Sequence, residues 1–190
     1  NAFTADVAAG LPGPDWLVGI RRTAVDGIDA VELPDTDEEV WRYSRIGELE
    51  IGRHAPLGRP PTAQTIVEHD LSTYGEMSAL IVVRNGWVLE VTTSSDALDA
   101  GLYVGPVANF PEGASLFGSA LEVPVDLFGH LNLAFGPEPA AVVVPDGVHL
   151  EAPVVVVVLS DADGAAVFPR VLVRVGADAT ATVIEQHTSA

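Results

Sequence analysis

The sequence contains no cysteine and no lysine, and both absences limit what the chain can do. Without cysteine there is no disulfide framework, no thiolate metal site made by this chain alone and no cysteine nucleophile. The nine basic residues, all arginine, stand against 27 acidic ones and give a formal net charge of -18. A surface of that sign repels phosphate backbones and anionic lipid headgroups. We therefore expect no nucleic-acid binding and no membrane binding.

Long apolar segments and common enzyme motifs are also missing. The longest strongly apolar run, residues 153–159, is far shorter than the ~20 residues of a membrane-spanning helix. No secretory signal is visible at the N-terminus, so a cytoplasmic location is expected. No phosphate-binding loop, dinucleotide-binding glycine pattern or nucleophile elbow occurs. The histidines lack the spacing of metal ligands; they are His54, His69, His130, His149 and His187.

The chain does contain enough apolar residues for a core. Its 190 residues are 48% hydrophobic, which excludes a disordered chain and suits one domain, or one domain with a small appendage. Three stretches differ in their residue patterns. We expect residues 1–60 to be helical with a Pro/Gly-rich link, residues 61–140 to mix helices and strands, and residues 141–190 to form short strands. Acidic residues occur in all three, which indicates a generally solvated surface.

Two helices are predicted in the first stretch. One covers residues 15–28, where apolar side chains recur at helical spacing. The other starts within residues 33–44, because the hydroxyl of Thr36 and the carboxylate of Glu39 have the spacing of a capping box. Trp41 lies on the apolar face of that second helix and is interpreted as a core anchor rather than a ligand platform.

The second stretch contains the clearest turn signal of the chain. Residues 79–84 and 87–91 are β-rich segments that flank Asn85-Gly86, and this dipeptide favours a type I′ hairpin turn. Further on, apolar residues at helical spacing predict a short helix over residues 126–134, with proline before it and Gly-Pro after it.

The last stretch indicates closely spaced strands. They are predicted at residues 141–144, 148–150, 154–159, 170–175 and 180–187, with sharp Pro and Gly corners between them. No helix-length segment intervenes, which excludes ordinary βαβ units. An antiparallel sandwich and a coiled parallel solenoid both fit. A faint repeat, which aligns Val144–Val148 with Val173–Ala177 about 29 residues further on, favours the solenoid.

Alternation along the last strand indicates which side chains share a face. Glu185 and His187 lie on the face of Val183, opposite Ile184, and the pattern does not decide which face is interior. If the strands stack in register, Glu185 and His187 would lie beside an arginine of the previous strand, such as Arg170. Such a cluster could orient an anion or hold a metal loosely; a solvated polar face beside an aliphatic stack is the more ordinary interpretation.

Several segments, taken in order, resemble the SufB/SufD family of iron–sulfur cluster assembly scaffolds, and SufD more than SufB. They are residues 33–44 (LPDTDEEVWRYS), the strand that ends at Asn85-Gly86, residues 126–134 (DLFGHLNLA), residues 144–153 (VPDGVHLEAP), and residues 168–170 with 182–185 (FPR and TVIE).

This resemblance implies a mainly β protein with an α-helical N-terminal region. Residues 141–190 would form the first strands of a right-handed parallel β-helix, a truncated solenoid. The resemblance also implies a non-catalytic scaffold subunit of the SUF system that pairs with a SufB-like subunit through the β-helix. A SufC-like ATPase would bind a C-terminal helical region. Both partners would therefore bind mostly through regions that this sequence does not include. The complex as a whole would handle the iron–sulfur cluster, so no cofactor and no cluster ligand is expected in this chain.

Family members are much longer, so the chain is expected to be an N-terminal portion of such a scaffold. An open solenoid end exposes unpaired strand edges, which predicts self-association. Two other functions stay open. A carbohydrate-active β-solenoid enzyme would need carboxylates paired across neighbouring strands, roughly 5–9.5 Å apart. An acidic binding module for a cation or a basic protein would need only the negative surface.

Overall fold

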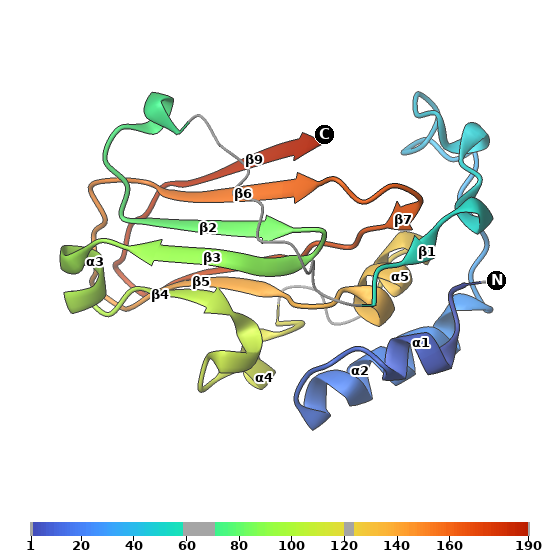
Figure 1. Ribbon diagram of the computed structural model, residues 1–190, viewed down its shortest axis with the longest axis horizontal. Coiled ribbons are helices and arrows are strands. Elements are labelled where there is room, and N and C mark those ends of the chain that lie inside the picture. Colours follow the sequence, from blue (N-terminus) through green and yellow to red (C-terminus); the bar gives the residue numbers. More distant parts are fainter. Residues whose placement is uncertain (1, 59–70, 120–123, 190) are drawn as a thin grey trace. The chain divides into compact units, whose positions relative to one another are not determined.

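A computed structural model describes residues 2–58, 71–119 and 124–189 (Figure 1). The chain forms two compact units, each assembled from three separate stretches. The helical unit comprises residues 1–59, 118–137 and 162–168, and the sheet unit comprises residues 60–117, 138–161 and 169–190. The first change of unit lies between residues 59 and 60. Beyond it the units interleave along the chain, because strands pair with partners that are distant in sequence.

The helical unit contains the two helices whose local signals were strongest. The predicted helices at residues 15–28 and 126–134 are confirmed as α2 (Asp15–Ile28) and α5 (Leu127–Phe135). The carboxylate of Asp126 caps α5, since its Oδ1 accepts a hydrogen bond from the backbone N–H of Gly129 at 2.9 Å. The unit also contains α1 (Ala5–Ala9), η1 (Ile46–Glu48), η2 (Ile51–Arg53) and a short parallel pair, β1 (Ala55–Pro56) with β7 (Ala165–Ala166).

The helix predicted over residues 33–44 is wrong. This segment forms successive turns. At its start, Oδ1 of Asp35 accepts a hydrogen bond from the backbone N–H of Asp37 at 2.7 Å. Such local side-chain bonds compete with helix formation. The segment also has little apolar surface to bury as a helix, since the side chain of Tyr43 is 94% exposed. Trp41 does pack, with its ring 5.2 Å from that of Phe128.

The sheet unit contains two sheets (Figure 1). The first has the strand order β3-β2-β6-β9 and the second has the order β4-β5-β8. The bounds of the strands are β2 (Ala79–Arg84), β3 (Trp87–Thr93), β4 (Tyr103–Pro106), β5 (Ala140–Val144), β6 (Val154–Ser160), β8 (Val171–Val175) and β9 (Val183–Ser189). The unit also contains short helical segments: η3 (Ser72–Tyr74), which precedes β2, and α3 (Ser95–Asp99), η4 (Val107–Asn109) and α4 (Gly113–Leu116), which lie between strands.

The predicted hairpin is confirmed. Strands β2 and β3 pair antiparallel around Asn85-Gly86, and both turn residues have positive φ, 52° and 84°. A type I′ turn requires this conformation at its two central positions, and asparagine followed by glycine adopts it most readily.

The strands of residues 141–190 pair in parallel, which excludes an antiparallel sandwich for this stretch. Strand β6 pairs with β9 so that Val154 opposes Val183, an offset of 29 residues. Strand β5 pairs with β8 so that Val144 opposes Val175, an offset of 31 residues. The predicted repeat was therefore misaligned by two residues at the corner after β5. Gly147 corresponds to Asp178, and both have positive φ, 72° and 54°.

The two sheets of this unit share one apolar core. Inward-facing residues of the first sheet and of the second sheet form a single buried cluster, which includes Ile81, Val156, Val142 and Val144. The other face of β6 is covered too, because Val155 and Val157 pack with Leu71, Tyr74 and neighbouring residues. A strand buried on both faces needs a continuous apolar run, and this explains the valine sequence of β6.

Within the described residues, no helix is both long enough and apolar enough to cross a bilayer.

Candidate functional site

The edge formed by β9 is the first candidate for a functional surface, and we call it the β9 edge. Strand β9 is the last strand of its sheet, and among the described strands it pairs only with β6 (Figure 1). Register settles which side chains face inward: Val183, Glu185 and His187 oppose Val154, Val156 and Val158, which belong to the shared core. Ile184 and Gln186 therefore lie on the opposite face.

The inner face of the β9 edge ends in a polar pair. Nε2 of His187 and Oε1 of Glu185 are hydrogen-bonded at 3.0 Å. The side chains are 63% and 47% exposed respectively. On the outer face, the hydroxyl of Tyr74 donates to Oε1 of Gln186 at 2.9 Å and fixes that amide. The structure thus brings together Glu185 and His187 at positions where the preceding strand has valine.

Arg170 lies elsewhere in the sheet unit. It precedes β8, a strand of the other sheet, and its guanidinium carbon lies 5.0 Å from the ring centroid of Phe117. This geometry is a cation–π contact. Burial lowers the pKa of Arg170. The neighbour of β9 is β6, so register does not place Arg170 beside Glu185 and His187.

The inner face of β8 is partly uncovered. Val173 and Val175 oppose the buried Val142 and Val144 of β5, yet their side chains are 47% and 42% exposed. The valines on this face are thus buried in β5 and about half-exposed in β8. The β8 and β9 edges therefore present apolar side chains that another strand could cover.

A cluster that sequence reasoning missed joins the hairpin turn to the end of β6. Arg84 holds Asp161 through its Nε, at 3.1 and 2.9 Å from the two carboxylate oxygens, and through Nη2 at 2.8 Å. Nδ2 of Asn85 donates to the same carboxylate at 2.7 Å, and its Oδ1 accepts from the N–H of Asp161 at 3.0 Å. The parallel register of β2 with β6, in which Arg84 opposes Leu159, brings these residues together.

This cluster predicts a pH-dependent stability. Hydrogen bonds from Arg84 and Asn85 hold the pKa of Asp161 below its ordinary value. A carboxylate with a lowered folded-state pKa stabilises the protein above its unfolded-state pKa, about 3.9, and the contribution is lost as the pH falls through the folded-state value. We expect Asp161→Asn to reduce the free energy of unfolding by about 1–3 kcal/mol at pH 7.

Urea unfolding at several pH values measures this difference. The gap between wild type and Asp161→Asn should shrink below about pH 4, where the wild-type carboxylate becomes protonated. Asp163→Asn is the matched control, because Asp163 is exposed two positions along the chain and should change little at any pH. A constant gap from pH 7 to pH 2 would contradict the role of the charged carboxylate.

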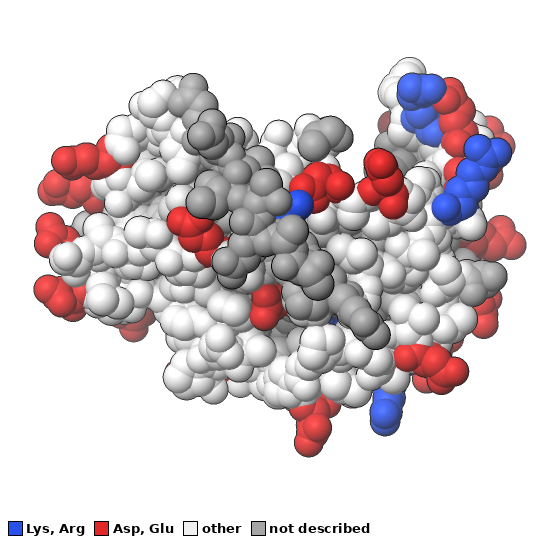
Figure 2. All heavy atoms as spheres, viewed as in Figure 1, with Lys and Arg blue, Asp and Glu red and all other residues white. Residues whose placement is uncertain are grey.

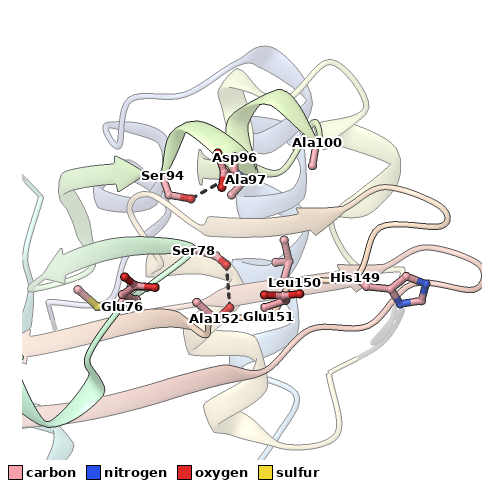
Figure 3. Close-up of a pocket in the computed structure, with 11 residues that line it drawn as sticks. Glu76, Ser78, Ser94, Asp96, Ala97, Ala100, His149, Leu150, Glu151 and Ala152 are labelled. Carbon is pink, nitrogen blue, oxygen red and sulfur yellow. Dashed lines mark hydrogen bonds between the residues drawn. The ribbon is translucent and has the colours of Figure 1, made fainter.

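A pocket of about 560 Å³ also lies in the sheet unit (Figure 3). Its lining includes the carboxylates of Glu76, Asp96 and Glu151, none of which belongs to a strand. Both serine hydroxyls of the lining have hydrogen-bond partners: Ser78 donates to the carbonyl of Ala152 at 2.7 Å, and Ser94 caps α3. The carboxylates do not have the cross-strand placement that the carbohydrate-active alternative requires.

Within the described parts of the chain, no group of three or more His, Asp and Glu side chains is placed to hold a metal ion. His149 bonds Thr180 through Nδ1 at 3.0 Å, and Nδ1 of His130 lies 3.3 Å from the carbonyl of Ala24. His69, with its acidic neighbours, lies outside the described residues.

The described residues define a protein whose sheet unit stacks parallel strands in register. No family model matches the chain. The chain is 22% identical over 176 residues to an iron–sulfur cluster assembly SufBD family protein of Synechocystis. The alignment covers 90% of this chain and 39% of that protein, so the chain spans about two fifths of its relative's length. The comparison supports the resemblance to the SufB/SufD family.

Proposed function

We propose that this chain is a non-catalytic scaffold component of an iron–sulfur cluster assembly system, and that it corresponds to the N-terminal portion of a SufD-like subunit. Its partners are a SufB-like subunit and, within the same complex, a SufC-like ATPase. The assembly works in the cytoplasm. The iron–sulfur cluster is the cargo of the whole complex, and we assign no cluster ligand to this chain.

One observation carries the proposal: the similarity to a SufBD family protein extends over 90% of the chain. It includes both the helical N-terminal region and the strands. A likeness that extends over most of the chain is more informative than one short motif, because motifs of a few residues recur by chance.

The strand geometry supports the finer part of the proposal, a right-handed parallel β-helix. Two successive passes of the chain stack with offsets of 29 and 31 residues, and their corners have matching positive-φ residues at Gly147 and Asp178. A repeating unit of this kind buries an aliphatic row against its neighbour and leaves an edge for the next unit. Parallel crossovers in a sheet are right-handed in nearly all proteins.

A scaffold built this way recognises partners through surfaces rather than through a reaction centre. The acidic side chains are spread over the face shown in Figure 2 and do not form one patch. With a net charge of -18, the chain attracts partner surfaces that are basic. The uncovered apolar side chains of Val173 and Val175 provide contact area that does not depend on charge.

Co-purification tests this function. The tagged full-length protein, of which this chain would be the N-terminal portion, is expressed with a SufB-like and a SufC-like subunit and recovered with and without ATP. We expect the SufB-like subunit to be retained and the SufC-like subunit to elute with it. Arg22→Met, a change at an exposed arginine, should leave recovery unaltered. Failure to retain either subunit in every nucleotide state, while the two still bind each other, would contradict the proposal.

A further inference from the structure

We propose that the pocket beside α3 binds a linear aliphatic polyamine, a flexible chain of methylene segments that joins separate ammonium groups. We call it the α3 pocket. Its lining comes from three segments of the sheet unit: residues 76–78, which precede β2, residues 94–100, which include α3, and residues 149–152, which precede β6 (Figure 3). The inference goes beyond the proposed function and is argued from this lining alone.

Hydrogen bonds hold the three segments of the α3 pocket together. The N–H of Ser78 donates to the carbonyl of Pro153 at 2.8 Å, and the N–H of Ser94 donates to the carbonyl of Ser78 at 2.9 Å. The hydroxyl of Ser78, a residue only 6% exposed, donates to the carbonyl of Ala152 (Figure 3). No lining residue belongs to β8, β9 or the chain between them, and strands added after β9 would stack on the side of β9 that faces away from β6. The pocket is therefore complete without any strand that follows β9.

The charge of the α3 pocket is of one sign. Figure 3 shows Glu76, Asp96 and Glu151 around it, one from each of the three segments, and no arginine is among the lining residues. The described residues of the sheet unit include three arginines, and each contacts another group: Arg84 binds Asp161, Arg174 binds Glu112, and Arg170 lies over the ring of Phe117. A pocket with carboxylates and no internal cation concentrates positive ligands.

The carboxylates are distributed around the pocket rather than gathered at one point. Among the described residues, no three acidic or histidine side chains are placed to hold a metal ion. His149 also lines the pocket, and its Nδ1 is hydrogen-bonded to the hydroxyl of Thr180 at 3.0 Å. A divalent metal ion needs oxygen ligands that converge to within about 2.0–2.6 Å of one centre. Separated carboxylates therefore suit a ligand whose own positive charges are separated.

Apolar side chains accompany the charged ones. Met77, Ala97 and Leu150 line the pocket, and each is the sequence neighbour of one of its carboxylates. Methylene segments lie favourably along such surfaces while their charged ends stay hydrated, as the stems of lysine side chains do. The volume of about 560 Å³ falls within the roughly 300–1,000 Å³ of small-molecule sites. Spermidine matches this lining, because it offers one protonated amine for each carboxylate and methylene segments between them.

Isothermal titration calorimetry of the full-length protein with spermidine tests the inference. We expect saturable binding that weakens as salt is added, because the carboxylates are exposed and salt screens them. Each single variant, Glu76→Gln, Asp96→Asn or Glu151→Gln, should weaken binding by about twofold to fivefold, and the triple variant by about tenfold or more.

A second triple variant separates the pocket from net charge. Glu90→Gln/Asp163→Asn/Asp178→Asn removes the same charge from exposed acids outside the lining and should change spermidine affinity by less than about twofold. Unchanged far-UV circular dichroism verifies that each variant is folded. Equal losses in the two triple variants would overturn the inference, since binding would then follow the overall charge of the chain.

Two further ligands separate a polyamine from other cations. Nα-acetyl-lysine methylamide carries a single ammonium group on a similar stem and should bind at least about tenfold more weakly than spermidine. Equal affinity would assign the pocket to lysine side chains of a partner protein and overturn the polyamine inference. Magnesium chloride should give no heat that the pocket variants abolish, and pocket-dependent magnesium binding would also overturn it. The proposed function is tested separately by co-purification and stands or falls without this pocket.

Discussion

Arg21→Met should reduce the free energy of unfolding by about 3–5 kcal/mol. Arg21 is fully buried within the helical unit, where its Nη1 donates to the carbonyls of Leu11 and Pro12 at 3.1 and 3.0 Å. Its Nη2 donates to the carbonyls of Gly136, at 3.1 Å, and Pro137. Methionine fills similar space but leaves these buried acceptors without their donor.

Burial lowers the pKa of Arg21 to about 10, so the guanidinium remains charged at neutral pH. Its charge lies next to carbonyls that follow α5, where the helix dipole is negative. Chemical denaturation measures the loss. Arg22→Met is the matched control, because Arg22 is exposed and its replacement should change the free energy by less than about 0.5 kcal/mol. Equal effects of the two substitutions would contradict the structural role of Arg21.

Gly176→Ala should reduce the free energy of unfolding by about 2–3 kcal/mol, here through a steric clash rather than lost hydrogen bonds. Gly176 occupies the corner after β8, directly against the previous corner of the chain. A Cβ atom there would lie 2.5 Å from the backbone nitrogen of Asp146 and 2.8 Å from its Cα. Backbone atoms cannot rotate away as a flexible side chain can, so the two stacked corners must separate.

Gly147→Ala distinguishes close packing from backbone strain. Gly147 has a φ of 72°, but a Cβ on it would meet nothing within 4 Å. Alanine at this position should reduce the free energy of unfolding by only about 1 kcal/mol, because its sole penalty is the left-handed backbone conformation. Thermal unfolding of both variants gives the comparison. A loss for Gly176→Ala no larger than that for Gly147→Ala would show that the corners are not stacked as described.

Local signals explain which elements could be predicted from the sequence. Asn85-Gly86 specifies its turn through its own backbone preference, and Asp126 caps α5 through a bond to a residue three positions away. The capping-box pattern at Thr36 failed because a pattern that satisfies a helix start does not supply a buried face, and Tyr43 remains exposed.

The features that were missed depend on distant parts of the chain. Asp161 and Arg84 are 77 residues apart and meet only through the parallel register of β2 with β6. The corner alignment was off by two residues, because Gly147 corresponds to an aspartate rather than to the next glycine. Arg21 had a usable signal: it shares helical spacing with Leu17 and Ala24, which are both buried.

Cross-strand nuclear Overhauser effects in the labelled chain test the parallel stacking of residues 141–190 most directly. Parallel pairing of β6 with β9 predicts contacts that join Val154 to Val183 and Val158 to His187, in the same order along both strands. Contacts that join Val154 to His187 and Val158 to Val183 would reverse the strand direction. That result would contradict the stacked parallel strands on which the scaffold proposal depends.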